Sequence, residues 1–141
     1  MAEKRSNDIK HLIDRPNFAH LSTLMPDGSP HSAPVWVARE GDLVLITTSA
    51  GSFKGKNTER DPRVSLSIID FKDPYTEVQM RGRVIERRPD PQLKYYDALS
   101  QKYIGKPWPY RDEKGPIVLV IEIAKAKYAK QPFKHAPASS A

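Results

Sequence analysis

The first hydrophobic pattern along the chain is helical. Ile9, Leu12 and Ile13 are spaced so that they share one face of a helix, and the residues around them are largely polar. Pro16 cannot continue a helix, because its ring removes a backbone donor and clashes with the preceding turn. The pattern therefore predicts a short amphipathic helix over residues 3–15.

Three short extended segments follow in quick succession. Residues 17–25 end at Pro26-Asp27-Gly28-Ser29, whose proline and glycine suit the central positions of a tight turn. Residues 31–39 follow directly, so the two segments are predicted to pair as a β-hairpin. Glu40-Gly41-Asp42 then turns the chain into a third segment, residues 43–49. Strands joined by such short turns run antiparallel, which predicts a β-meander.

The pattern changes in the middle of the chain. Residues 50–62 are polar and basic, and they predict a loop with a short helix. Residues 63–70 alternate between apolar and polar side chains, as a half-buried strand does. A long strand is expected over residues 75–88, and Gly82 within it predicts a bend or a close backbone approach.

The last third of the chain predicts one more helix and one more strand. Asp90 and Pro91 suit the N-cap and the first position of a helix over residues 91–104. Residues 116–124 form the last predicted strand. The remaining residues, 125–141, are basic and rich in proline, alanine and serine, which predicts a partly disordered tail.

Together these elements predict a single, mainly β domain. The chain has 141 residues, a length that suits one domain. Six antiparallel strands with flanking helices are typical of a small barrel. We therefore expect one domain over residues 1–124, followed by the tail.

Composition narrows the class of protein. The chain has no cysteine, which excludes disulfides and thiolate metal sites. Its apolar runs are far shorter than a membrane span, and its charged N-terminus does not resemble a signal peptide, so a soluble cytoplasmic protein is expected. The net charge of +6 favours anionic partners such as a phosphorylated cofactor or nucleic acid.

The sequence lacks the familiar catalytic and metal-binding motifs. None of its 4 histidines has a zinc-binding spacing, and no nucleophile or nucleotide-binding motif is present. We therefore expect no metal and no catalytic side chain. His20 and His31 lie in the predicted hairpin, where we expect structural roles: His20 hydrogen-bonded within the hairpin and His31 near its turn.

The most informative stretch joins the third strand to the basic loop. Thr47, Thr48 and Ser49 end the strand, a glycine-containing loop follows, and Lys54 and Lys56 supply positive charge. Hydroxyls, backbone amides and ammonium groups are the donors that bind a phosphate. A lysine-rich loop is as often a solvated surface, so the residues alone leave both interpretations open.

Aromatic residues offer a weaker hypothesis. Tyr75, Tyr103, Trp108 and Tyr110 are of the kind that barrels use in their cores, and near basic residues they can also stack on nucleic-acid bases. No RNA-binding signature accompanies them, so nucleic-acid binding is not the preferred interpretation.

Four segments, in order along the chain, carry a family pattern. They are Phe18 to His31, Pro34-Val35-Trp36, Lys54 to Val64, and Arg81-Gly82-Arg83-Val84. Together they resemble the pyridoxamine 5'-phosphate oxidase-like split β-barrel family, and within it the flavin/deazaflavin oxidoreductases that use coenzyme F420. The resemblance extends from about Ile9 to Ile123.

The resemblance implies a fold and a cofactor site. The fold would be the six-stranded antiparallel split β-barrel that also binds flavin mononucleotide (FMN), assembled as a homodimer with cofactor sites at the interface. Coenzyme F420 is the expected cofactor and FMN the alternative, since many relatives carry arginine where this chain has Ser52. The residues implied to bind it are Pro34, Val35, Trp36 and Val37 beside the ring, Thr47, Thr48, Ser49, Lys54, Lys56 and Asn57 around the phosphate and tail, and Gln79 and Trp108 from the other subunit.

The resemblance also implies an activity. We expect an oxidoreductase that transfers a hydride from reduced deazaflavin to a small conjugated or electron-poor molecule. Such chemistry belongs to the cofactor, so the protein need only bind the ring, orient the substrate and exclude water. The alternatives are an FMN-dependent oxidase or reductase of the same fold and a non-catalytic cofactor-binding protein.

Overall fold

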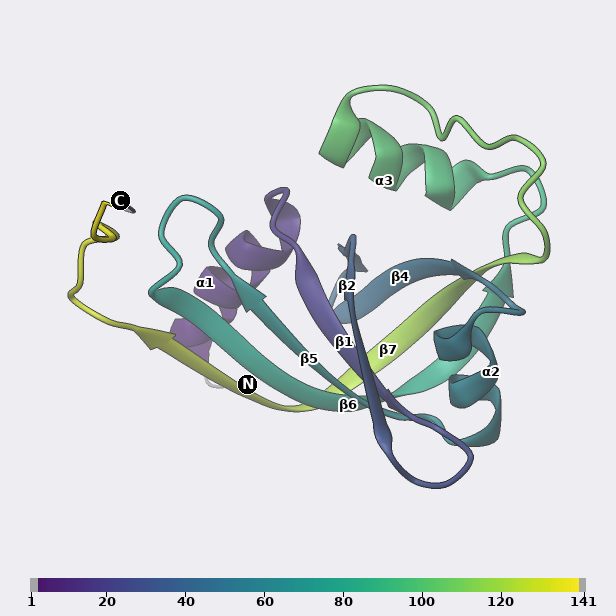
Figure 1. Cartoon of the computed structure of the whole chain (residues 1–141), viewed down its shortest axis with the longest axis horizontal. Helices are drawn as coiled ribbons and strands as arrows, with labels where there is room; N and C mark the ends of the chain where they lie inside the picture. Colours follow the sequence, from purple (N-terminus) through teal and green to yellow (C-terminus); the bar gives the residue numbers. More distant parts are fainter. Residues whose placement is uncertain (1–2, 140–141) are drawn as a thin grey trace.

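The computed structural model describes residues 3–139. It is a mainly β structure in which one antiparallel sheet carries three helices (Figure 1). The strands lie in the order β2-β1-β5-β6-β7-β4-β3. In chain order the elements are α1 (Glu3–Asp14), β1 (Ala19–Leu24), β2 (Pro30–Val35), β3 (Ala38–Glu40), β4 (Leu43–Ser49), α2 (Phe53–Arg60), β5 (Arg63–Ile69), β6 (Thr76–Pro89), α3 (Lys94–Ile104) and β7 (Pro116–Lys130).

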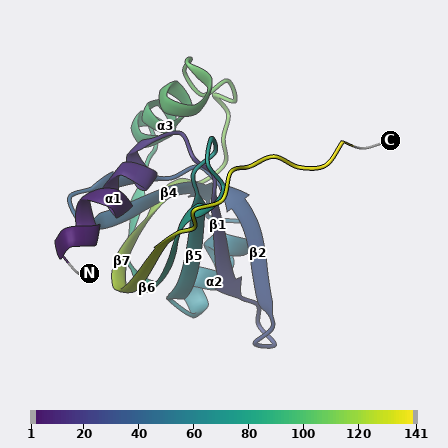
Figure 2. The same cartoon turned by 90° about the vertical axis from the view of Figure 1, so that its left-hand side faces the viewer.

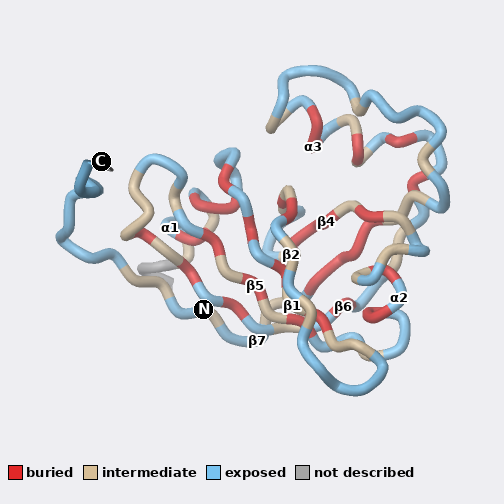
Figure 3. Tube along the Cα trace, in the orientation of Figure 1, coloured by how far each residue is buried: buried red, intermediate tan, exposed pale blue. Residues whose placement is uncertain are grey.

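The core lies between the inner face of the sheet and α1. Ile9, Leu12 and Ile13, the three residues of the predicted helical face, are all buried. They pack with inward-facing strand residues such as Leu66 and Met80. Figure 2 shows α1 along one side of the sheet, and Figure 3 shows buried segments alternating with exposed ones along the central strands. Burial of these apolar side chains is the main force that holds the helix against the sheet.

The long strands β6 and β7 are bent where the sequence predicts it. Their register shifts between Arg81 and Gly82 and again between Val84 and Glu86. A Cβ atom at Gly82 would collide with the carbonyl oxygen of Glu122 on β7. Only glycine permits this approach of the two backbones, and the predicted close contact at this position is confirmed.

The predicted strand over residues 31–39 is in fact two strands, which makes seven strands where six were expected. β2 is an edge strand that contains Pro30 and Pro34, and it ends at Val35. Val37, in the gap before β3, bonds through its backbone to side chains of α3 rather than to a neighbouring strand. The strand is therefore interrupted by a contact with a distant part of the chain.

The last strand is longer than the sequence pattern suggests. β7 continues past Ala124, the predicted end, to Lys130, where it pairs with Thr76 at the start of β6. Part of the segment expected to be a tail is therefore strand, because β6 is long enough to offer it backbone partners. Within residues 3–139, no helix is long and apolar enough to cross a membrane.

Helix α3 begins later than predicted. Its first residue is Lys94 instead of Pro91, and Leu93 before it adopts a left-handed backbone with φ of 58°. Asp90 still acts on the helix start, because its carboxylate accepts hydrogen bonds from the backbone of Tyr95 and Tyr96. In Figure 1 the helix lies above the sheet, connected to it by irregular segments at both ends.

Candidate functional site

A pocket of about 440 Å³ opens where five parts of the chain meet. These are the residue before β1, the end of β2, the end of β4, the start of α2, and the region of α3 with the loop that follows it. The pocket brings together many of the residues that the sequence singled out. Those lining it are Pro34, Val35, Trp36, Thr47, Thr48, Ser49, Lys54 and Trp108.

One end of the pocket is polar and is organised by Ser52. The Ser52 hydroxyl lies 2.7 Å from the Thr48 hydroxyl and donates to the carbonyl oxygen of Ser49 at 2.8 Å. It also accepts a hydrogen bond from the Gly55 backbone at 3.0 Å and so caps the N-terminus of α2. Ser52 thereby joins the first turn of the helix to the end of β4.

Gly55 allows α2 to lie this close to β4. A Cβ atom there would collide with the backbone oxygens of Ser49 and Ala50. The absence of a side chain brings the N-terminus of the helix, with its partial positive charge, to the wall of the pocket. Helix N-termini of this kind bind anions.

Lys54, in the first turn of α2, is half-buried and lines the same end of the pocket. Burial lowers the pKa of its ammonium group below the ordinary value of 10.5. No carboxylate in the part of the chain that the structure describes forms an ion pair with it. A partly desolvated cation, a helix N-terminus and the hydroxyls of β4 together form a set of donors suited to an anionic group.

The other end of the pocket is aromatic. Trp36 stands edge-on to Trp108, with ring centroids 5.7 Å apart. Trp108 also contacts Tyr96 at 5.4 Å and donates from its indole nitrogen to Glu113 at 3.1 Å. Phe18 completes this side of the lining. A pocket lined both by aromatic rings and by anion-binding groups suits a ligand with a flat ring and a phosphate.

Two residues predicted to bind the cofactor lie outside this pocket. The Val37 side chain is fully buried in the core, and Lys56 is exposed on α2. Neither lines the pocket. The residue after Trp36 turns inward as the chain leaves β2, and Lys56 lies two residues beyond Lys54, where a helix faces a different direction.

Asn57 is also outside, and it has a structural role. Its amide nitrogen donates to the Thr23 hydroxyl at 3.0 Å and contacts the Met25 sulfur at 3.3 Å. Its amide oxygen accepts from Arg60 at 3.1 Å. With its polar atoms used in this way, Asn57 fastens α2 to β1 rather than facing the pocket.

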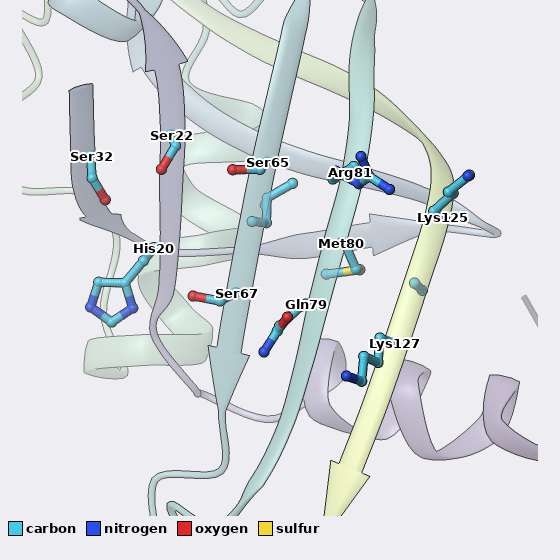
Figure 4. A pocket seen from close by; sticks show the side chains of 12 residues that line it. His20, Ser22, Ser32, Ser65, Ser67, Gln79, Met80, Arg81, Lys125 and Lys127 are labelled. Carbon is cyan, nitrogen blue, oxygen red and sulfur yellow. The ribbon is translucent and has the colours of Figure 1, made fainter. Parts of the chain in front are cut away.

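Gln79 lies in a second hollow, of about 590 Å³, on the outer face of the sheet (Figure 4). Its amide nitrogen donates to Glu77 at 3.0 Å. Ser65, Arg81 and Lys125 are side by side in register across β5, β6 and β7 in the same hollow. This chain's own pocket therefore does not contain Gln79.

Gln79 was expected to act from the other subunit, so its place outside this pocket does not contradict that expectation, whereas the place of Trp108 differs from it. The resemblance implied that it would act from the other subunit, but it lines the pocket of its own chain. Sequence reasoning had also missed Phe18, Tyr96 and Glu113 as lining residues. Tyr96 lies in the predicted helix over residues 91–104, whose pattern gives no sign of a ligand site, and Glu113 belongs to no pattern that points to one.

The histidines lie away from the pocket. His20 is exposed on the outer face of β1 and makes no hydrogen bond through its ring to any described residue, so the expected bond within the hairpin is wrong. His31, on β2 near the turn, packs on Phe53 with ring centroids 5.2 Å apart. Residues 3–139 contain no cluster of three or more acidic, histidine or cysteine side chains that could hold a metal.

The chain is similar to several known proteins. A family model described as pyridoxamine 5'-phosphate oxidase matches residues 6–130. An F420 reductase of known structure is 30% identical, with a TM-score of 0.77 over 84% of this chain and 94% of its own. A conserved hypothetical protein of Mycobacterium tuberculosis is 22% identical, with a TM-score of 0.77 over 100% of this chain and 95% of its own.

More distant structures share the fold. General Stress Protein 26 of Bacillus anthracis is 19% identical, with a TM-score of 0.67 over 87% of this chain and 92% of its own. No curated protein matches the sequence. The structural likeness confirms the antiparallel split-barrel fold expected from the resemblance. This chain belongs to the pyridoxamine 5'-phosphate oxidase-like family, whose members are mostly flavin or deazaflavin oxidoreductases.

Proposed function

We propose that this protein is a reductase that uses coenzyme F420 and acts on small conjugated or electron-poor molecules. The observation that carries the proposal is Lys54, a half-buried cation that pairs with no carboxylate among the described residues and lines a pocket that also contains aromatic rings. A relative that is 30% identical over most of the chain is an F420 reductase. When bound, the reduced deazaflavin supplies a hydride.

The residues of the pocket have separate tasks in this proposal. Lys54, the hydroxyls of Thr47 and Thr48, and the start of α2 hold the anionic part of the cofactor. The backbone of Pro34 to Trp36 and the ring of Trp108 form the walls beside the flat ring and exclude water. Among the described residues, no histidine lines the pocket, and Glu113, the one acidic residue that does, accepts a hydrogen bond from Trp108. A protein acid is not required, because water can supply the proton that the reduced substrate needs.

A specific observation keeps FMN as the second candidate cofactor. Ser52 occupies a position at which the family resemblance implies arginine in many relatives. Its hydroxyl caps α2, and it contributes no charge to the site. The remaining donors suit any phosphate. The family model that matches the chain is itself described as pyridoxamine 5'-phosphate oxidase.

The homodimer is part of the proposal as well. Gln79 lies on the outer face of the sheet, away from the pocket of its own chain. A second subunit covering that face would allow Gln79 to reach the partner's cofactor. The interface would then complete each site from two chains.

Titration with the two cofactors tests the function. The purified protein is mixed with F420 and with FMN while absorbance and fluorescence are followed, and the reduced F420 complex is then offered a panel of conjugated and electron-poor acceptors. Tighter binding of F420 and oxidation of its reduced form by an acceptor are expected. Tighter binding of FMN favours the second candidate, and F420 binding without turnover on any acceptor favours a non-catalytic carrier. Failure of both cofactors to bind would sink the proposal.

A further inference from the structure

The part of the pocket wall that contains Trp36 lies in a gap between two strands. β2 ends at Val35 and β3 begins at Ala38, so Trp36 and Val37 lie between two strands. Buried backbone groups need hydrogen-bond partners, and a gap in a strand removes the usual ones. Something else must therefore hold this segment, and with it the Trp36 ring that lines the pocket.

Two consecutive residues of α3 supply the missing partners. The Tyr103 hydroxyl accepts a hydrogen bond from the Val37 backbone nitrogen at 3.1 Å. The Lys102 ammonium donates to the Val37 carbonyl oxygen at 2.5 Å. Both polar backbone groups of Val37 are thus satisfied by side chains from a helix more than sixty residues further along the chain.

The same two side chains also reach the body of the domain. Lys102 donates to the carbonyl oxygen of Ile13, in the last turn of α1, at 2.5 Å. Tyr103 donates to the carbonyl oxygen of Asn17 at 2.5 Å. The segment before β1, the gap after β2 and the C-terminal half of α3 are therefore tied together at one point.

Tyr103 sets the position of the Trp36 ring as well. The two rings are stacked, with centroids 5.1 Å apart and planes 3° from parallel. The opposite neighbour of Trp36 is Trp108, which meets it edge-on. Trp36 is thus held between α3 and the loop that follows α3, both of which lie above the sheet (Figure 1).

We propose that Lys102 and Tyr103 are positioning residues. They fix the Val37 backbone and the Trp36 ring, and thereby the position of the pocket wall against which the flat ring of a cofactor lies. We call this pair of side chains the clamp. The effect on turnover rests on the proposed function, whereas the effect on Trp36 does not. Neither residue lines the pocket itself. They act through Trp36 and Val37.

The two hydrogen bonds that Lys102 donates do not require its positive charge. Burial lowers the pKa of Lys102 to about 8, and the nearby Asp14 carboxylate, which is itself paired with Arg39, opposes this shift. A neutral amine still has two N–H groups. Those two donors match the carbonyl oxygens of Ile13 and Val37, so Lys102 has enough donors for both bonds on either side of this pKa.

Two variants separate the clamp from general stability. Tyr103→Phe removes one oxygen atom and keeps the stacked ring, and Lys102→Met removes the donors and keeps the length of the side chain. Lys94→Met, an exposed lysine of the same helix, is the matched control. Thermal unfolding identifies which variants remain folded, and Tyr103→Phe carries the test if Lys102→Met does not.

The kinetic experiment looks for a split between binding and turnover. The anionic part of the cofactor is held at the Lys54 end, which the clamp does not touch. The clamp substitutions should displace the reacting ring by a fraction of an ångström, and a displacement of this size slows the chemical step. We therefore expect kcat to fall about tenfold or more in both clamp variants. The Kd of F420 should stay within about threefold, and Lys94→Met should match the wild type. Unchanged kcat in both folded clamp variants overturns the proposal.

A spectroscopic experiment needs no cofactor. In a Trp108→Phe background, Trp36 is the one remaining tryptophan. Its fluorescence emission should shift to the red and become easier to quench with acrylamide when either clamp residue is replaced, but not with Lys94→Met. This fluorescence measurement tests whether Lys102 and Tyr103 position Trp36, even if F420 does not bind and the proposed function fails. An unchanged Trp36 emission in both folded variants overturns this positioning role.

Discussion

At the scale of single residues, Lys54 stands out because the fold has partly removed its charge from water without giving it a partner among the described residues. Desolvating a cation costs free energy that an ion pair ordinarily offsets. Hydroxyls and a helix N-terminus line the pocket with it, and Glu113, the acidic residue of the lining, accepts a hydrogen bond from Trp108 and forms no ion pair with Lys54. We therefore expect an anionic group of the ligand to pair with Lys54.

Replacing Lys54 should weaken cofactor binding. A charge-assisted contact contributes about 1.5–3 kcal/mol, so Lys54→Ala is expected to raise the Kd of the cofactor roughly tenfold or more. Lys56→Ala is the matched control, because it removes the same charge from the same helix at an exposed position outside the pocket. Isothermal titration of both variants checks this. Equal losses would indicate a long-range effect of charge, and no loss in Lys54→Ala would remove this residue from the site.

The same lysine predicts a pH dependence. Burial lowers the pKa of Lys54 in the unbound protein, and a bound anion would raise it again. A group whose pKa is higher in the complex favours binding fully below its unbound pKa and loses that contribution as pH rises through the bound value. The Kd of the cofactor should therefore rise at alkaline pH in the wild type. The Lys54→Ala variant should lose most of this slope, and an equal slope in both proteins would contradict the assignment.

At the scale of elements, the pocket depends on how closely α2 approaches β4. Gly55 permits that approach, since a Cβ atom there would meet two backbone oxygens. Helix propensity alone would favour alanine at this position by about 1 kcal/mol. The contact with rigid backbone opposes that gain, so packing and propensity make opposite predictions for one substitution.

Packing should win. Gly55→Ala is expected to lower the free energy of unfolding by about 1–3 kcal/mol, the usual cost of overfilling a packed site. Gly51→Ala is the control, because a Cβ at Gly51 would meet nothing within 4 Å. Urea denaturation measures both variants. A Gly55→Ala protein as stable as the wild type would show that α2 can move away from β4 without cost.

Sequence patterns predicted the elements of this fold better than its site. The amphipathic helix at Ile9 and the bend at Gly82 follow from local spacing and local sterics, and both are present. The gap at Val37 depends on Lys102 and Tyr103, which no local pattern could connect to it. Asn57 resembles a ligand-binding residue until its contact with Thr23 is known. Local chemistry shows what a side chain can do, and only the tertiary structure shows which neighbour uses it.

At the scale of the whole molecule, the proposed dimer has a direct test. An obligate interface of this kind buries on the order of 2,000 Å² or more and persists at micromolar concentration. Sedimentation equilibrium should therefore give twice the mass of the 16.0 kDa chain. If Gln79 reaches the partner's site, Gln79→Ala should weaken cofactor binding without altering the mass. A 16.0 kDa species with undiminished cofactor affinity would contradict the dimer.

The position of two prolines in β2 also limits how the molecule can assemble. In an antiparallel pair, alternate residues direct their backbone groups toward the neighbour and away from it. Pro30 and Pro34 are two residues either side of Ser32 on this edge strand, so the outward-facing positions retain a single N–H, that of Ser32. A strand from another chain would find almost no donors there. The β2 edge is therefore a poor template for joining copies of this protein into a continuous sheet, which is a route by which β-proteins aggregate.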